Sequence, residues 1–191
     1  DGQKHIFDQV VIATHSDQAK NLLRDASKEE NKILNSIRYK KNTAVLHTDP
    51  NCMPKKKNAW ASWNYLSEND KETNNTCLTY WMNRLQNIDH KFPLFVTLNP
   101  FQKIPEAKLI NSFNYAHPMF DKEALSAQSQ LWKIQGKRRT WFCGAYLGYG
   151  FHEDGLQAGL AVAEAIGKTK RPWKTNDLQN RLCINDGLLK G

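Results

Sequence analysis

Residues Thr140 to Gly167 read TWFCGAYLGYGFHEDGLQAGLAVAEAIG, which is the most informative stretch of the chain. The pattern predicts a buried strand, a glycine-rich turn and a helix that begins near Glu153 or Asp154. Glycines at positions 144, 148, 150 and 155 would let the backbone adopt positive φ and approach a ligand closely. The helix would point its free N–H groups and its positive dipole end above the turn, which favours an anionic or electron-rich group there. This layout is typical of a cofactor-binding turn.

Two common phosphate-binding motifs fail in this turn. Gly150 and Gly155 have the first spacing of a Walker A loop, but Leu156 and Gln157 follow in place of the lysine and the hydroxyl residue. The dinucleotide fingerprint Gly-x-Gly-x-x-Gly fails because, after Gly148 and Gly150, the next glycine comes two residues late. An ordinary tight connection between a strand and a helix remains the alternative to a cofactor-binding turn.

The same strand and helix resemble the C-terminal end of FAD-dependent amine oxidases and protoporphyrinogen-oxidase-like flavoproteins. Those sequences close with an apolar strand ending in Phe-x-Gly, a loop, and a helix of the pattern Gly-x-x-Glu-Gly-Ala-x-x-Ser-Gly-x-x-Ala-Ala. Here residues 141–144 read WFCG and residues 154–163 read DGLQAGLAVA. The chain departs from the family at Ala145, where an acidic residue usually lies near the ribityl-phosphate part of the cofactor.

A bacterial subgroup of predicted NAD/FAD-binding, amine-oxidase-like proteins is similar over a longer part of the chain. Its resemblance covers roughly residues 3–173 and includes GAYLGYGFHEDG at residues 144–155. Four further segments also resemble the subgroup and occur in the same order along the chain: FDQVVIATH at 7–15, AWASWNY at 59–65, YWMNRLQ at 80–86 and FVTLNP at 95–100.

The resemblance implies that the helix N-terminus faces the N1/O2 edge of the flavin and stabilises the charge that builds there on reduction. The positions that would lie against the cofactor are Gly144, Gly150, Asp154, Gly155 and Gly159. In the family, the dinucleotide fingerprint and its acidic partner lie N-terminal to everything seen here. We therefore expect a C-terminal portion of a flavoprotein, with FAD bound weakly or not at all until the missing N-terminal FAD-binding segment is supplied.

The element pattern predicts an α+β (α/β) fold with a largely antiparallel mixed sheet. Residues 1–26 would end a strand of the FAD-binding domain and cross over, and residues 27–137 would form the substrate-domain sheet with helices. Residues 138–173 would form the C-terminal strand, turn and helix, and residues 174–191 a polar tail. Within this scheme we expect one strand at Ile6–Ala13, covered on both faces because its apolar run is continuous.

The remaining elements follow from capping and periodicity. A helix is expected to start near Ser16 or Asp17, and a capping box at residues 27–30 predicts a second helix over residues 28–37. A third is expected over residues 121–134. Strands are expected over residues 42–48, 59–66, 77–85, 94–98 and 109–115.

Five aromatic residues fall in two successive strands that are expected to pair as a hairpin, with Trp60 and Trp81 on one face. Their functional interpretation is an aromatic wall of a substrate cavity over the flavin. Their structural interpretation is core or cross-strand packing. The five residues are Trp60, Trp63, Tyr65, Tyr80 and Trp81.

His152 lies immediately before the expected cofactor helix, and this position makes it the candidate proton carrier. His117, after a strand, is a weaker candidate, and both have the alternative of being loop residues that only form hydrogen bonds. Glu153 and Asp154 favour the first turn of the helix through its dipole. No metal site is expected.

Composition limits the remaining classes of function. The 191 residues carry 27 Lys and Arg against 19 Asp and Glu, for a net charge of +8, but the basic residues are scattered. We therefore expect no nucleic-acid binding, although a basic nucleic-acid-associated protein is kept as a hypothesis. The four cysteines show no metal or disulfide spacing and are expected to be reduced and unpaired. No apolar run spans a membrane and no signal segment is present, so a cytoplasmic protein is expected.

These observations predict the C-terminal portion of an FAD-dependent, amine-oxidase-like oxidoreductase that removes hydride from an unidentified small-molecule substrate. The fragment alone is expected to be inactive and to self-associate, because its cofactor-facing side would leave apolar surface uncovered. The alternative is a cofactor-free binding domain that retains the flavoprotein substrate-domain fold.

Overall fold

The chain forms two compact units in the computed structural model, which describes residues 2–67, 76–173 and 182. The strand–helix unit comprises residues 1–39 with 118–191, and the sheet unit comprises residues 40–117. A five-stranded antiparallel sheet, a two-stranded parallel sheet and helices confirm the predicted α+β mixed fold. The sheet unit is narrower than the expected segment 27–137, because the helix near residue 30 and residues 118–137 pack in the strand–helix unit.

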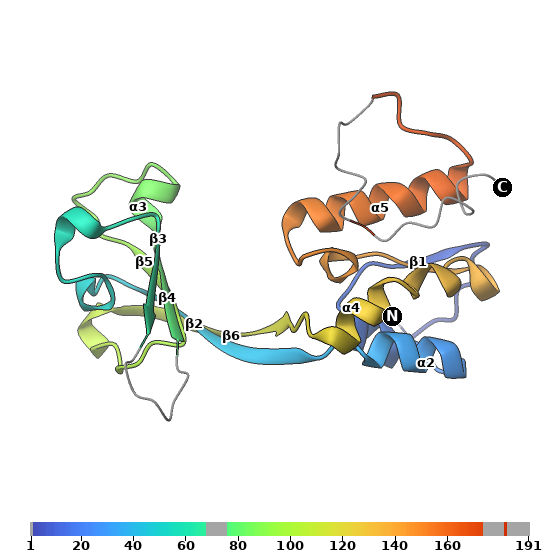
Figure 1. Cartoon of the computed structure of the whole chain (residues 1–191), viewed down its shortest axis with the longest axis horizontal. Coiled ribbons are helices and arrows are strands. Elements are labelled where there is room, and N and C mark those ends of the chain that lie inside the picture. The colour runs from blue at the N-terminus through green and yellow to red at the C-terminus, as the bar shows by residue number, and fades with distance from the viewer. Residues whose placement is uncertain (1, 68–75, 174–181, 183–191) are drawn as a thin grey trace. The chain divides into compact units, whose positions relative to one another are not determined.

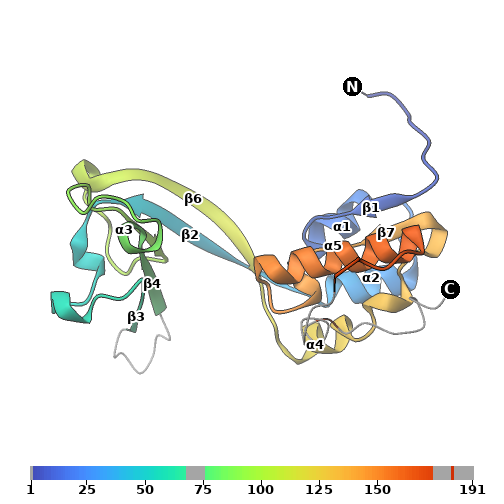
Figure 2. The same ribbon diagram turned by 90° about the horizontal axis from the view of Figure 1, so that it is seen from above.

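The strand–helix unit is built on two parallel strands, β1 (Val10–Ile12) and β7 (Thr140–Phe142). Helix α5 (His152–Gly167) covers one face of the pair, and α2 (Lys28–Asn35) and α4 (Lys122–Gln128) lie on the other (Figure 1). Helix α1 (Ser16–Leu22) follows β1, and Figure 2 shows α5 running alongside β7.

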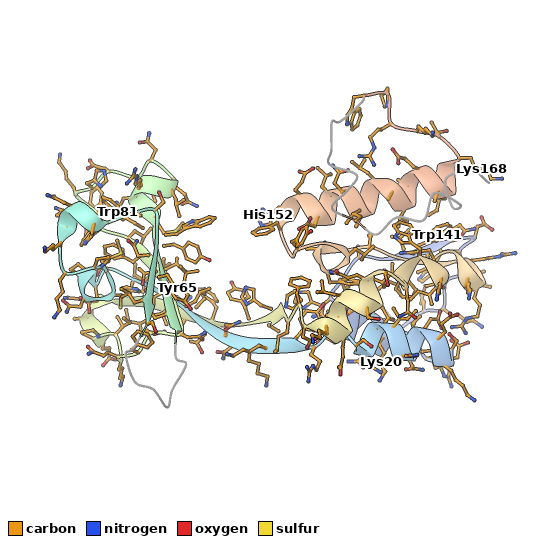
Figure 3. All side chains as sticks on the ribbon, viewed as in Figure 1. Lys20, Tyr65, Trp81, Trp141, His152 and Lys168 are labelled. Carbon is orange, nitrogen blue, oxygen red and sulfur yellow. The ribbon has the colours of Figure 1, made fainter. Side chains whose placement is uncertain are left out.

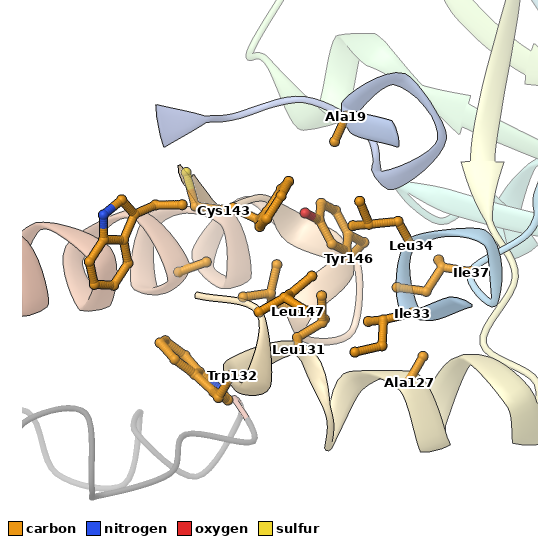
Figure 4. Close-up of a cluster of buried hydrophobic side chains, with 14 of the residues drawn as sticks. Ala19, Ile33, Leu34, Ile37, Ala127, Leu131, Trp132, Cys143, Tyr146 and Leu147 are labelled. Carbon is orange, nitrogen blue, oxygen red and sulfur yellow. The ribbon is translucent and has the colours of Figure 1, made fainter. Parts of the chain in front are cut away.

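Apolar side chains from all of these elements meet in one core. Phe142, Leu34, Leu131 and Ile134 are fully buried in it, and Tyr146 is buried among them (Figure 4). The expected tail beyond residue 173 lies outside the described residues except for Leu182, which is buried against the same core.

Helix starts agree with their sequence signals. In α2, Ser27 and Glu30 form the predicted capping box, with Glu30 N–H donating to Ser27 Oγ at 3.1 Å. Helix α1 begins at Ser16, as expected. The single helix expected over residues 121–134 is divided: α4 ends at Gln128, and a short 3-10 turn, η4 (Leu131–Lys133), follows.

The sheet unit has the strand order β3-β4-β5-β2-β6. Strands β3 (Trp63–Ser67) and β4 (Thr76–Trp81) form the predicted antiparallel hairpin, and β4 also pairs with β5 (Phe95–Leu98). The other strands are β2 (Tyr39–His47) and β6 (Leu109–Pro118), which lie side by side in Figure 2. Short 3-10 turns connect them: η1 (Pro50–Cys52), η2 (Lys57–Ala59) and η3 (Glu106–Lys108).

Two expected strands are shorter than predicted because asparagine side chains bind neighbouring backbone. The strand expected from residue 59 begins at Trp63, since Asn64 accepts from the Ala61 N–H at 2.9 Å and donates to its carbonyl at 2.7 Å. The strand expected to reach residue 85 ends at Trp81, and α3 (Met82–Leu85) follows. There the Asn83 amide donates to the Phe92 carbonyl at 2.9 Å.

The expectation of a strand at Ile6–Ala13 covered on both faces is wrong. Only residues 10–12 form a strand, and Ile6 and Phe7 are 88% and 68% exposed. Val10 and Val11 are also exposed. An apolar run shows that a segment can be buried, but it does not show whether another element packs against it.

Candidate functional site

The predicted turn between β7 and α5 is present, and its glycines have different roles. Gly150 has φ 88° and Gly144 has φ 157°, whereas Gly148 and Gly155 do not have the positive φ that the sequence suggested. Gly148 is required for another reason. A Cβ there would lie 2.6 Å from Asp154 Oδ1, so the turn packs directly on the Asp154 carboxylate.

Asp154 is fully buried and holds the turn against α5. Its Oδ2 accepts hydrogen bonds from the backbone N–H groups of Tyr149 at 3.0 Å and Phe151 at 2.8 Å. This carboxylate therefore supplies negative charge at the positive end of the helix from within the chain. The N–H groups of His152 and Glu153, which begin the helix, have no preceding carbonyl within it and are directed beyond the helix end.

Gly155 and Gly159, the other expected cofactor positions, lie within α5. A Cβ at Gly155 would approach the backbone nitrogen of Ala145 to 3.6 Å, an ordinary contact distance, and a Cβ at Gly159 would meet nothing within 4 Å. Neither position is required to be glycine by its protein neighbours. A ligand that approaches closely would be one reason for a glycine at 155.

The two edges of the parallel sheet differ. The Gln135 side chain closes the β7 edge, because its amide donates to the Phe142 carbonyl at 2.7 Å and its Oε1 accepts from the Phe142 N–H at 2.8 Å. On the other side, Ile12 directs its carbonyl toward β7, where it accepts from the Cys143 N–H at 3.1 Å. Backbone groups alternate in direction along a strand, so those of Val11 point away from β7. Within the described residues, the β1 edge carries no third strand.

The five aromatic residues divide between the two faces of the β3–β4 hairpin. Trp60 and Trp81 share a face as expected: their ring centroids are 5.2 Å apart in a T-shaped contact, and Trp60 also contacts Phe95 at 5.8 Å. The Trp60 Nε1–H donates to the Pro54 carbonyl at 2.8 Å. This pair is therefore packed as the structural interpretation predicted.

The other three residues of the set lie on the opposite face. Trp63 is paired with Tyr80 across the hairpin, with ring centroids 6.1 Å apart, and Tyr65 lies two residues further along β3 on the same face. Trp63 and Tyr65 are 62% and 67% exposed. Figure 3 labels Tyr65 and Trp81 on the sheet unit. We call this the open aromatic face.

The open aromatic face continues across the sheet. Tyr80 is opposite Val96 and Leu78 is opposite Leu98, and these four residues face the same way in adjoining strands. Val96 and Leu98 in turn lie opposite Leu46 and Ala44 of β2.

The two candidate histidines lie on separate units. His152 is the first residue of α5 and is exposed, as its labelled side chain shows in Figure 3. His117 is also exposed, in β6, with Nδ1 2.9 Å from the amide nitrogen of Asn42. Within the described residues, no group of three or more His, Cys, Asp or Glu side chains could hold a metal ion.

Sequence reasoning missed a buried polar chain on the face of the sheet opposite to the open aromatic face. His47 Nδ1 accepts from the Asp49 N–H at 3.1 Å, so its Nε2 carries the proton and donates to Thr97 Oγ1 at 2.7 Å. Thr97 Oγ1 lies 2.9 Å from Thr79 Oγ1. Burial lowers the pKa of His47, which keeps its ring neutral.

No protein-family model matches this chain, and no curated protein sequence matches it. The flavoprotein resemblance therefore rests on the motifs quoted from the sequence. No helix in the described part of the chain has the length and apolarity needed to cross a bilayer.

Proposed function

We propose that this chain supplies the C-terminal strand, turn and helix and the substrate sheet of an FAD-dependent oxidoreductase of the amine-oxidase type. The observation that carries the proposal is the connection from β7 through a turn with positive φ at Gly150 to the N-terminus of the 16-residue helix α5. The flavin would perform the hydride chemistry, and the N–H groups that begin α5 would stabilise charge at its N1/O2 edge.

The open edge of β1 supports a contribution from a further polypeptide segment. Gln135 already occupies the β7 edge, so only the β1 edge can accept another parallel strand. A cavity of about 490 Å³ lies beside β1, lined by Val10, Val11, Leu22 and Thr140 among others. A strand of a dinucleotide-binding unit would pair with the backbone of Val11 and cover these apolar side chains. This segment would supply the pyrophosphate and ribose contacts.

The open aromatic face is the proposed substrate surface. Trp63 and Tyr65 offer exposed apolar area and ring faces to an organic substrate, and the partly buried Tyr80 lies against Trp63 on the same face. His152 is the proposed proton carrier or hydrogen-bond donor at the flavin edge, because it begins α5.

Asp154 favours the alternative of a cofactor-free binding domain. Its carboxylate already accepts the N–H groups of Tyr149 and Phe151, and a buried negative charge at this helix end opposes a second negative charge on a reduced flavin. Flavin binding decides between the two functions.

The experiment compares FAD binding by the chain alone with binding after addition or fusion of a dinucleotide-binding segment. We expect weak or no binding to the chain alone and a yellow, stoichiometric complex with the segment present. In that complex, Gly155→Ala should abolish flavin retention while the unfolding free energy is unchanged or higher, because the structure has room for the methyl group and alanine favours helix.

The matched control is Gly167→Ala in the last turn of α5, where a Cβ meets nothing within 4 Å. It should leave flavin binding unchanged. Absence of flavin binding with the segment present would favour the cofactor-free domain. Full retention in Gly155→Ala would show that the flavin does not approach α5 at this residue.

A further inference from the structure

Two cysteine thiols line one cavity in the sheet unit. The cavity has a volume of about 220 Å³, and its wall includes Cys52 at the end of η1 and Cys77 near the start of β4. Asp49, Leu66, Phe101 and Ile104 complete much of the lining. Both thiols are free, so the cavity is lined by two reduced cysteines that lie 25 positions apart in sequence.

Both thiols line the cavity beside the buried polar chain. The Cys52 thiol lies beside the Thr97 side chain, and the Cys77 thiol lies beside the Thr79 side chain. The Oγ1 atoms of those two threonines are 2.9 Å apart. Each sulfur therefore lies next to one member of an adjoining hydroxyl pair, and the charge of Cys77 influences the ionisation of Cys52.

We propose that Cys52 and Cys77 form a reversible disulfide when the protein reacts with a hydroperoxide. One thiol attacks the peroxide oxygen and becomes a sulfenic acid, with release of one water molecule if the oxidant is hydrogen peroxide. The second thiol then attacks the sulfenic sulfur and releases a second water molecule. Two protons and two electrons leave the thiols, and one hydrogen peroxide is reduced to two water molecules.

Exposure assigns the order of the two steps. Cys52 is partly exposed, whereas Cys77 is 2% exposed. Cys52 is therefore the peroxide-reacting thiol and Cys77 the thiol that resolves the sulfenic acid. Burial raises the pKa of both thiols, which lowers their thiolate fraction at neutral pH and makes the reaction slow, so the test requires a high peroxide concentration.

Cys143 provides a built-in comparison. It is also buried and free, with its pKa raised by burial, but it lies in the core of the strand–helix unit. A thiol in this setting has no adjoining cysteine among the described residues with which to react. The difference between Cys77 and Cys143 under oxidation therefore measures the effect of pairing rather than of burial.

The experiment treats the reduced, folded chain with millimolar hydrogen peroxide, blocks remaining thiols with N-ethylmaleimide, and maps peptides without reduction. We expect one cross-linked peptide pair containing Cys52 and Cys77, a mass loss of two hydrogens, and two of the four cysteines protected from alkylation. Dithiothreitol should restore all four. The cross-link should form equally in Cys143→Ser.

The variant Cys77→Ser should stop the reaction at the Cys52 sulfenic acid, detected as a dimedone adduct. Oxidation of Cys52 to the sulfinic acid with Cys77 still free in the wild-type chain would overturn the proposal. So would two unreacted thiols in the folded chain under conditions that oxidise the urea-unfolded chain. The wild-type peptide map decides the question even if Cys77→Ser does not fold.

Discussion

The interiors of the two units are built from different side chains. In the strand–helix unit, Phe142, Leu131 and Ile134 belong to one apolar core in which helices from both faces meet. In the sheet unit, the inward positions of three adjacent strands carry His47, Thr79 and Thr97, all with no exposed surface. Packing, which depends on shape and area, dominates the apolar core of the strand–helix unit. The interior of the sheet unit combines packing around Phe95 with hydrogen bonds that have a fixed direction.

This difference predicts different sensitivities. An apolar core loses stability in proportion to the volume removed from it, and it is insensitive to pH. A buried polar chain is sensitive to loss of a single atom, because a donor or acceptor left without a partner is costly in an apolar environment. Substitutions in the two interiors can therefore test whether the contrast seen in the structure is also a contrast in energy.

Truncation of the apolar core should have the largest effect. Phe142 is fully buried among the core side chains, so Phe142→Ala should lower the free energy of unfolding by roughly 3–5 kcal/mol. Urea denaturation monitored by circular dichroism measures it. The control is Phe92→Ala in the sheet unit, where the side chain is 69% exposed and the loss should be small. Equal losses in the two variants would contradict the packing that the structure shows around β7.

Removal of one hydroxyl should have the next largest effect. Thr97→Val keeps the shape of the side chain but leaves the Nε2–H of His47 without its acceptor and removes the Thr79–Thr97 hydroxyl contact, so we expect a loss of about 1–3 kcal/mol. Thr43→Val is the matched control, since the Thr43 hydroxyl donates to Asn114 at 3.2 Å on an exposed part of the same sheet. A Thr97→Val variant as stable as the control would show that the polar chain contributes nothing.

The sequence predicted those elements whose signals are local. Ser27 and Glu30 lie three residues apart and specify the start of α2, and the structure confirms the capping box. The ends of β3 and β4 were predicted less well, because Asn64 and Asn83 bind backbone groups in loops whose course depends on the rest of the sheet. The exposure of Val10 and Val11 in β1 could not be predicted, because it depends on which elements pack against this strand in space. The closure of the β7 edge by the Gln135 amide has no distinctive pattern in sequence either.

The features of the candidate site that depend on local sequence were also predicted, whereas those that depend on tertiary packing were not. The strand, turn and helix at residues 140–167 and the positive φ of Gly150 follow from the glycine pattern. The role of Gly148 does not, because it is set by the position of Asp154 in space. The chain through His47 and Thr97 did leave a signal: both are polar residues in apolar, alternating strands, and assignment of the strand faces would have placed them inward.

A third test concerns the pH dependence of the stability of the sheet unit, which we attribute to His47 in the buried polar chain. The folded-state pKa of His47 is below its ordinary value of 6.5 because burial disfavours the charged ring. The unfolded chain therefore binds more protons than the folded chain below about pH 6.5. Stability of the sheet unit is fully present above this pH and declines as the pH falls through it, with a slope of at most about 1.4 kcal/mol per pH unit for one group.

The measurement is hydrogen exchange of the sheet-unit amides between pH 7 and 5, corrected for intrinsic exchange rates. It reports the stability of the sheet unit separately from that of the strand–helix unit. The variant His47→Gln should remove the slope in that range. Asp49, whose pKa is also low, acts in a separate window: burial raises its pKa, but hydrogen bonds from Lys108 and the Asn51 N–H outweigh burial. Its contribution is lost only below its ordinary value of 3.8. A slope unchanged in His47→Gln would assign the pH dependence to another group.

The smallest effect is expected at the one buried hydroxyl of the apolar core that has no hydrogen-bond partner among the described residues, that of Tyr146. Tyr146 is 2% exposed in the strand–helix unit, and its hydroxyl has no hydrogen-bond partner among the described residues. Burial, followed by the proximity of Tyr39 and Cys143, raises its pKa, so the phenol stays protonated. Folding removes this hydroxyl from water without giving it a hydrogen bond within the described part of the protein. Tyr146→Phe should therefore raise the free energy of unfolding by about 0.5–1 kcal/mol.

The control is Tyr39→Phe, which removes an oxygen that accepts the Ser16 N–H at 2.9 Å and should therefore destabilise the same unit. Urea denaturation of the two variants side by side measures the opposite signs, and a loss of stability in Tyr146→Phe would show that the hydroxyl has a partner in solution.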